Sequence, residues 1–263
     1  MRAPFPTRAA AVLLLLATAC TRAGAAVPTS CARAHEALRV PILLYHHVGQ
    51  PAGKYPELYV DPDVFIEQME AIAHSGATTL TMSELAQAMC THRTFEHGAI
   101  AITFDDGAVD QQDAFDVMQA NGIRSTFYIP TSRIGAKDSL TWAQLGSMAQ
   151  SRLVDIEDHT MTHADLTRIS LDDSRAEIRG APAALREHLG ISARQFAYPY
   201  GHMDAAIEQL LRTAGFATAV TTTYSWDHES SDAMRWGRLE VHSTNLPRDL
   251  ATLAQQSGRW IRT

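Results

Sequence analysis

The stretch AIAITFDDG, residues 99–107, decides the fold of this chain. Its first six residues are apolar or β-branched, which is typical of a strand buried on both faces. The run ends on two adjacent carboxylates, Asp105 and Asp106, and Gly107 lets the chain turn closely behind them. Because burying an unpaired carboxylate is costly, this strand end predicts either a plain Asp-Asp-Gly turn or a site where another group compensates the charge.

Similar strand-like runs recur on both sides of this stretch, and helix-like segments separate them. Asp61 followed by Pro62 marks a helix start, and Thr81 with Glu84 forms a capping-box pattern. The alternation predicts a parallel α/β sheet or barrel in a single domain. The expected strands are residues 40–48, 99–105, 124–130, 153–158, 194–198, 216–224 and 237–242, and the other expected helices are 109–121, 141–150, 171–189, 204–214 and 247–256.

The ends of these strand-like runs collect side chains that bind metals or carry protons. In parallel α/β folds, ligands bind at the carboxyl ends of the strands. We therefore expect these residues to meet at one mouth of the fold, although they are far apart in sequence. They are His46, His47, Asp105, Asp106, His159, His163, Tyr198, Pro199, Tyr200, Gly201 and His242.

The HTMTH segment at residues 159–163 places two imidazoles four residues apart, on one face of a helical turn. Alone, this spacing is a weak indication of a metal site. Two histidines and one carboxylate are, however, a common catalytic zinc set that leaves a position open for water. With Asp106 as the carboxylate ligand, Asp105 would face that water and take its proton, because successive residues of a strand point opposite ways.

These motifs resemble those of the polysaccharide deacetylases of carbohydrate esterase family 4, the NodB-homology domain. TFDDG at residues 103–107 matches the first motif of the family, HTMTH at 159–163 the second, and YPYG at 198–201 the core of the third. The order and spacing of the three are more specific than any one of them. The resemblance covers about residues 39–255 and implies a distorted (β/α) barrel with about seven parallel strands.

The resemblance also implies roles for the matching residues of the first two motifs. Asp105 would be the general base. Asp106, His159 and His163 would hold one divalent metal ion, which is usually zinc in this family, with cobalt and nickel as alternatives.

Two further roles concern the remaining motifs. The backbone N–H of Tyr200 would help to hold the tetrahedral oxyanion. His242, in LEVHS, would protonate the leaving amine; the alternative is a histidine hydrogen-bonded in the rim of the barrel. His46 and His47 are expected to be structural or to support the ligands.

The sequence departs from the family pattern in three places. Ala197 stands where many members have an arginine that pairs with the base, and Arg194 and Arg238 are candidate substitutes. A subgroup acting on poly-β-1,6-N-acetylglucosamine, which includes exported lipoproteins, also tends to read FAYPYG, so the alanine points to that subgroup. Glu157–Asp158 would add negative charge near the metal, and Trp226–Asp227 only loosely resembles the fourth motif.

The N-terminus has the pattern of a secretory signal, with two arginines, a short apolar run and then small residues. Cys20 follows a sequence that resembles a bacterial lipoprotein box, and plain cleavage is the alternative. We expect a signal peptide at residues 1–19, a tether at 20–38 and a catalytic domain at 39–263. The protein would be exported, either as a periplasmic or outer-membrane lipoprotein anchored through Cys20 or as a secreted protein.

Charge and cysteine content limit the partners further. The net charge of −7, without a cluster of lysine and arginine, argues against nucleic acid as a partner. Export implies an oxidising compartment, where Cys31 and Cys90 either form a disulfide or stay as two buried thiols.

The sequence thus predicts a metal-dependent hydrolase that removes N-acetyl groups from N-acetylglucosamine units of an envelope or extracellular polysaccharide. One alternative is an O-acetyl esterase acting on xylan or peptidoglycan sugars. The other is a glycan-binding lipoprotein without catalytic activity.

Overall fold

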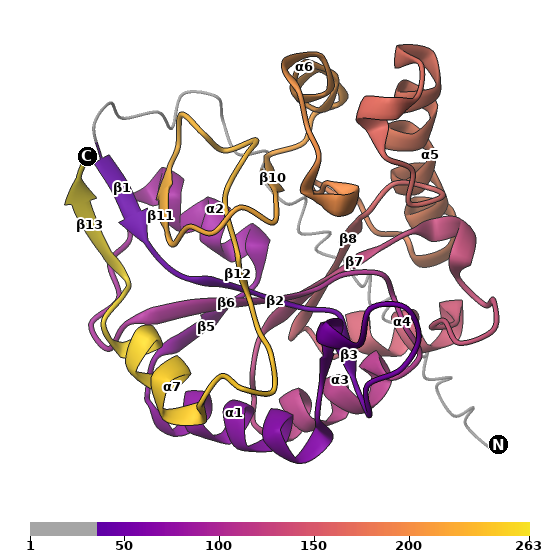
Figure 1. The fold of residues 1–263 in the computed structure, drawn as a ribbon. Helices are drawn as coiled ribbons and strands as arrows, with labels where there is room; N and C mark the ends of the chain where they lie inside the picture. The colour runs from indigo at the N-terminus through magenta and orange to yellow at the C-terminus, as the bar shows by residue number, and fades with distance from the viewer. Residues whose placement is uncertain (1–35) are drawn as a thin grey trace, which may run out of the picture.

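The computed structural model describes residues 36–263, and a curled parallel sheet forms its centre (Figure 1). Seven strands follow one another in the order β10-β9-β8-β7-β6-β2-β12, and β5 pairs with the first half of β6. These seven are the strands expected from the sequence, so the predicted distorted (β/α) barrel with about seven parallel strands is confirmed, and it has the form of a half-barrel. The strands are β2 (Ile42–Tyr45), β5 (Thr78–Leu80), β6 (Ala99–Phe104), β7 (Ser125–Ile129), β8 (Val154–Asp158), β9 (Gln195–Ala197), β10 (Thr218–Val220) and β12 (Leu239–Glu240).

The segment 233–240 links the two edges of this half-barrel. Its first part runs beside β10, where Trp236 N–H donates to the carbonyl of Ala219 at 3.0 Å and Arg238 N–H donates to that of Thr223 at 2.8 Å. Its last two residues form β12, which pairs in parallel with β2. The segment therefore crosses from one edge of the sheet to the other and carries Arg238 between them.

Seven α-helices lie in the described part of the chain, all at positions predicted from the sequence. The expected caps are present: Asp61 accepts a hydrogen bond from the N–H of Asp63, and Thr81 with Glu84 forms a complete capping box. In Figure 1, α1 and α7 lie side by side along the lower edge, and α5 and α6 lie at the top right. The helices are α1 (Pro62–His74), α2 (Met82–Thr91), α3 (Gln111–Ala120), α4 (Trp142–Gln150), α5 (Leu171–Leu189), α6 (Ala205–Ala214) and α7 (Pro247–Gln255).

Smaller elements complete the fold. A three-stranded antiparallel sheet joins β1 (Glu36–Arg39), β11 (Asp227–Glu229) and β13 (Arg259–Arg262). A short parallel pair joins β3 (His47–Val48) and β4 (Tyr59–Val60). Four short 3-10 helices lie among the described residues: η2 (Pro56–Leu58), η3 (Thr131–Arg133), η4 (Leu166–Arg168) and η5 (Pro199–Gly201).

The antiparallel sheet bears on two expectations. Residues 36–38, the end of the segment expected to be a tether, belong to β1; the rest of that segment and residues 1–19 lie outside the described residues. Trp226–Asp227, the loose match to the fourth motif, holds this sheet together: Asp227 accepts two hydrogen bonds from Arg39 at 2.7 and 2.9 Å, and the Arg39 guanidinium lies over the Trp226 ring.

Cys90, in the last turn of α2, is disulfide-bonded, and its partner lies outside the described residues. This excludes a free thiol at Cys90, while the expected pairing with Cys31 stays a prediction because Cys31 lies outside the described residues. Within residues 36–263, no helix has both the length and the hydropathy needed to cross a membrane.

The alternation of side chains along the strands gives the sheet two different faces. Phe104, Phe127 and Ile156 point to one face and join the apolar core that also contains residues of α1, α3, α4, α5 and α7. The residues that alternate with these along the strands point to the other, inner face. Thr103 and Asp105 are two of them, and both are buried beside Arg238. The candidate site lies at the carboxyl end of this inner face.

Candidate active site

Asp105 and Asp106 follow β6 directly. The N–H of Asp105 continues the sheet by donating to the carbonyl of Tyr45 at 3.0 Å, and its side chain is buried. Asp106 has a left-handed backbone with φ 76°, and Gly107 follows with φ 65°. The sheet hydrogen bonds therefore reach Asp105, and the chain turns at Asp106, while an oxygen of each carboxylate stays within 4 Å of Nε2 of His159.

The carboxylate of Asp106 lies beside both histidines of the HTMTH segment. Its Oδ1 atom is 3.1 Å from Nε2 of His163 and 3.7 Å from Nε2 of His159. Donors that bind one zinc ion at about 2.0–2.1 Å in a tetrahedron lie about 3.3 Å apart. The three predicted ligands are therefore brought together at a spacing that suits one metal ion, with ligand atoms all within 4.8 Å of one another.

The protonation of these groups also suits a metal. Nδ1 of His159 lies 2.7 Å from the carbonyl of Ala197, and in the tautomer that donates this hydrogen bond Nε2 carries the lone pair that a metal ligand needs. Burial, assisted by the charge of His159, lowers the pKa of His163 to about 4, so this imidazole is neutral at pH 7. Among the described residues, Oδ1 of Asp106 is buried without a hydrogen-bond partner. Two imidazole nitrogens and a free carboxylate oxygen are a donor set that fits a divalent ion such as zinc.

The loop that carries the histidines is not the helical turn expected from the sequence. Thr160 and His163 both have left-handed backbones, with φ 67° and 65°. The loop is held from within, because the N–H of Thr160 donates to Asp158 at 2.6 Å and the N–H of His163 donates to Oγ1 of Thr160 at 2.9 Å. The two rings meet edge to face with their centroids 4.7 Å apart.

Arg238 pairs with Asp105, the contact expected of the arginine that many family members have at the position of Ala197. Its side chain is fully buried and grips Asp105 with two hydrogen bonds, Nη1 to Oδ1 at 2.8 Å and Nη2 to Oδ2 at 2.6 Å. It also donates to the carbonyl of Thr221 and to Oγ1 of Thr103. The sequence offered Arg194 and Arg238 as candidates, and the structure selects Arg238.

This ion pair sets the charge of Asp105. Burial alone would raise the pKa of this carboxyl group, but the charge and hydrogen bonds of Arg238, together with His159, hold it well below its ordinary value. Asp105 is therefore ionised at neutral pH. Its Oδ2 atom lies 3.9 Å from Nε2 of His159, so it borders the candidate metal ligands.

Glu157 and Asp158 do not place their charges at the metal ligands as expected. Oε2 of Glu157 accepts the N–H groups of Arg194 and Gln195 at 2.7 and 2.9 Å, which joins β8 to β9 where the strands pair at only one position. Asp158 accepts from the loop as described above. Burial raises the pKa of both carboxyl groups well above the ordinary value, which favours their neutral forms.

Tyr200 lies on η5, beside the candidate metal ligand His163. Its backbone is left-handed with φ 62°, its side chain is 55% exposed, and its ring packs edge to face on His163 with centroids 4.8 Å apart. Gly201 follows with φ 71°, and a Cβ atom there would lie 2.2 Å from Oγ1 of Thr222. The glycine of the YPYG motif is thus required by close packing behind the tyrosine.

Two histidines follow the carboxyl ends of β2 and β12, the next two strands of the sheet after β6. The registers Leu239↔Leu43 and Leu43↔Ile102 place His242 and His46 level with Asp105. His46 is one strand away from Asp105 and His242 is two strands away. Nδ1 of His242 lies 3.0 Å from the carbonyl of Glu57, which fixes the ring.

His47 lies apart from this group. Its ring stacks on Tyr59 at 4.2 Å, and Nδ1 lies 2.9 Å from a carboxylate oxygen of Asp110. These contacts agree with the structural role expected from the sequence.

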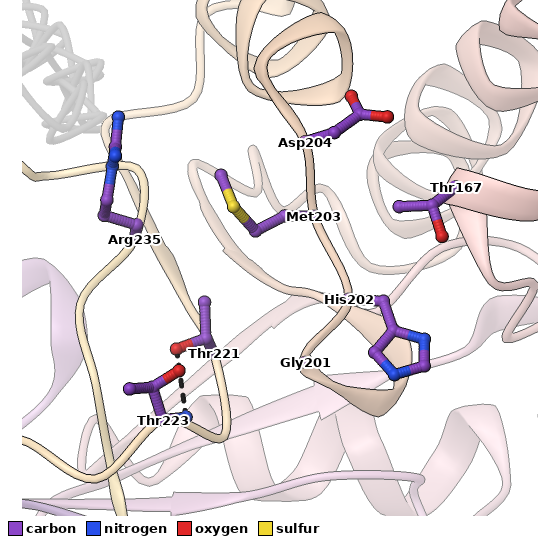
Figure 2. A pocket seen from close by; sticks show the side chains of 8 residues that line it. All are labelled: Thr167, Gly201, His202, Met203, Asp204, Thr221, Thr223 and Arg235. Carbon is purple, nitrogen blue, oxygen red and sulfur yellow. Dashed lines mark hydrogen bonds between the residues drawn. The ribbon is translucent and has the colours of Figure 1, made fainter.

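A cavity of about 560 Å³ begins at Gly201, the last residue of η5 (Figure 2). Gly201, His202 and Met203 lie along one side of it, and Thr221 and Thr223 lie on the other. The ring of His202 is 5.9 Å from that of Tyr200. The cavity is therefore lined by the end of η5 and by the residues that follow it, next in the chain to Tyr200.

The sequence and the fold both match known deacetylases. Residues 92–219 match the family model of the polysaccharide deacetylases. The chain is 27% identical over 185 residues to the Bacillus subtilis protein named "Putative polysaccharide deacetylase YxkH", an alignment that covers 70% of this chain and 64% of that one. The chain thus spans less than two thirds of the length of this relative.

Solved structures share the architecture. The Streptococcus pyogenes deacetylase PplD, determined with acetate, superposes with a TM-score of 0.76 at 24% identity, covering 83% of this chain and 99% of that one. IcaB from Ammonifex degensii superposes with a TM-score of 0.66 at 26% identity, covering 82% and 97%. Residues 92–219 thus carry a polysaccharide deacetylase domain of the NodB-homology type, carbohydrate esterase family 4.

Proposed function

We propose that this protein is a metal-dependent deacetylase that removes acetyl groups from N-acetylglucosamine units of an envelope or extracellular polysaccharide. One observation carries the proposal: a complete set of metal ligands lies beside a buried carboxylate that Arg238 keeps ionised. Asp106, His159 and His163 would hold the ion, with zinc favoured by the donor set. A turn without chemical function would need neither the histidines nor the arginine.

Each residue then has a step to perform. The bound ion would lower the pKa of a water molecule and polarise the acetyl carbonyl. Asp105 would take the proton of the water as its oxygen bonds to the acyl carbon, and the N–H of Tyr200 would donate to the oxyanion. The carbon–nitrogen bond then breaks, the amine receives a proton, and acetate leaves.

The donor of that last proton is a choice between two histidines. The family resemblance favours His242, while the sheet register places His46 one strand closer to Asp105. His46 is half-buried, and burial lowers its pKa against the opposing charges of Asp105 and Asp106. We therefore include both residues as candidates, and substituting each by glutamine separates them.

A polymeric substrate is supported by the surface around the site. Tyr55, Val109, Tyr200, Tyr224 and Leu246 are among the large apolar side chains that remain exposed, and each lies on a loop that follows the carboxyl end of a strand. Sugar rings have apolar faces that bind such side chains. The FAYPYG segment, residues 196–201, supports N-acetylglucosamine as the unit, and the signal and lipid anchor predicted from the N-terminus support an envelope location.

The test is acetate release by the purified protein. The substrates are β-1,6-linked N-acetylglucosamine oligomers, chitin oligomers and acetylated xylan, each assayed with and without a chelator. We expect release from an N-acetylglucosamine polymer, loss with chelator, and recovery on adding zinc or cobalt.

Three outcomes would change the proposal. No release from any substrate by metal-loaded protein would leave a glycan-binding protein. Release from xylan alone would favour an O-acetyl esterase. Undiminished release by the Asp105→Asn variant would refute Asp105 as the base.

A further inference from the structure

We propose that Glu177, on α5, is a positioning residue that sets the affinity of the metal centre by holding the backbone between its two histidines. The inference rests on the metal centre proposed above. Glu177 belongs to none of the motifs that identify the family, and it does not touch the three ligand side chains.

The loop between the histidines is strained and needs support. Thr160 and His163 are both non-glycine residues with left-handed backbones, and each such residue costs about 1–2 kcal/mol relative to the right-handed form. The internal hydrogen bonds of the loop use the N–H groups of Thr160 and His163. The N–H groups of Met161 and Thr162, between them, need partners from elsewhere in the fold.

Glu177 supplies those partners. Its Oε2 atom accepts the N–H of Met161 at 2.9 Å and the N–H of Thr162 at 2.8 Å, and its Oε1 atom accepts the hydroxyl of Thr162 at 2.8 Å. Successive N–H groups of this kind form a concave site for an anion. One carboxylate therefore accepts a hydrogen bond from every donor of Met161 and Thr162.

The packing of α5 brings Glu177 close enough for this contact. One turn further along the helix, Gly180 faces Met161, and a Cβ atom at this position would overlap the Met161 side chain, with Sδ at 1.8 Å. On the opposite side of the loop, Ser132 N–H donates to the carbonyl of Met161 at 2.8 Å. The loop is thus held between α5 and η3, with Glu177 as its charged contact.

A carboxylate suits this place better than an amide. Glutamine has one acceptor oxygen where glutamate has two, so it would turn an NH₂ group toward either the backbone N–H groups or the Thr162 hydroxyl. In the Glu177→Gln variant we expect the histidines to be less well placed before the ion arrives. Supporting contacts of this kind change metal affinity by about 10–100-fold.

The experiment measures metal binding directly. The dissociation constants of zinc and cobalt are measured by chelator competition for the wild type and for Glu177→Gln, Glu177→Asp and Glu187→Gln. Glu187 is an exposed residue of the same helix, so its variant removes one charge without touching the loop. Glu177→Asp keeps the charge but shortens the side chain by one methylene. Hydrogen exchange of the Met161 and Thr162 amides is followed in the metal-free proteins.

We expect the dissociation constant to rise about tenfold or more in both Glu177 variants and to stay at the wild-type value in Glu187→Gln. The two amides should exchange faster in both Glu177 variants. Wild-type affinity and exchange in Glu177→Gln would overturn the inference. Wild-type affinity in Glu177→Asp alone would show that charge, and not position, is responsible, which also overturns it.

Failure of the proposed function has a different signature. If the wild type binds neither metal, the metal centre is refuted, while the exchange measurement still decides whether Glu177 holds the loop. A fall in thermal stability of the metal-free variant without a change in metal affinity would reduce Glu177 to a structural contact and refute its positioning role.

Discussion

Replacing Arg238 by methionine should leave the buried carboxylate of Asp105 without its cationic partner. Methionine keeps an apolar stem inside the fold but removes both hydrogen bonds to the carboxylate, as well as those to Thr103 and Thr221. The two charge-assisted bonds contribute about 1.5–3 kcal/mol each. Removing one partner of a buried ion pair typically costs about 3–5 kcal/mol, which agrees with that sum. We therefore expect the free energy of unfolding of the Arg238→Met variant to be about 3–5 kcal/mol lower than that of the wild type at neutral pH.

The sign of the pH dependence follows from the pKa of Asp105. In the wild type this pKa lies below its ordinary value of 3.8, so the ion pair stabilises the fold above that pH and the contribution is lost as pH falls through the lowered pKa. In the Arg238→Met variant, burial would act with less opposition and raise the pKa of Asp105. The stability difference between the two proteins should therefore grow as pH rises from acid to neutral.

The assays are denaturant unfolding at several pH values and the pH profile of acetate release. Because a general base contributes about 10²–10⁴-fold, the variant should lose activity in that range at neutral pH, and its acidic limb should move to higher pH. The double variant Arg238→Met with Asp105→Asn should be more stable than Arg238→Met alone, because no unpaired charge stays buried. An unchanged acidic limb, or a stability loss below about 1 kcal/mol, would refute the coupling.

Two further predictions test the support around the site. Gly201→Ala should lower the rate of acetate release while the midpoint of denaturant unfolding changes little, because its Cβ atom would press on Thr222 and displace Tyr200. Acetate release at the wild-type rate would contradict this. Glu157→Gln should unfold at higher denaturant concentration than the wild type, by a margin that grows with pH above about 4.5, because the buried carboxyl group has a raised pKa and loses stability on ionising while the amide does not titrate. A margin independent of pH would show that Glu157 is ionised in the fold.

The strands and helices were predictable because each has a local signal. The seven strands on the main path of the sheet are apolar runs bounded by caps and turns, and the helices begin at residues such as Asp61 and Thr81 whose side chains cap them. β5 has only three residues, and β11 and β13 are largely polar, so neither kind stands out. Their formation depends on pairing with distant strands, which no local pattern records.

The site was predictable to the extent that its residues follow strand ends. The metal ligands and Asp105 could be proposed from motifs, but the partner of Asp105 could only be narrowed to two arginines. Arg238 lies 133 positions away from it in sequence, and the path of segment 233–240 brings them together. Left-handed backbones at Asp106, His163 and Tyr200 were not predictable either, because non-glycine residues adopt them only where the surrounding structure holds them.

These left-handed residues lie at the proposed site, and their strained backbones depend on supporting contacts from the rest of the fold. Each of the three motifs contributes one of these left-handed residues near the candidate metal ligands, and another element supports the chain beside it. Gln111 donates a hydrogen bond to the carbonyl of Asp105, and Glu177 accepts the N–H of Thr162, just before His163. Thr222 lies against Gly201, just after Tyr200. None of these supporting residues needs to touch a substrate. We therefore expect substitutions at such positions to change metal affinity or turnover before they unfold the protein, which separates them from substitutions in the apolar core, where stability falls first.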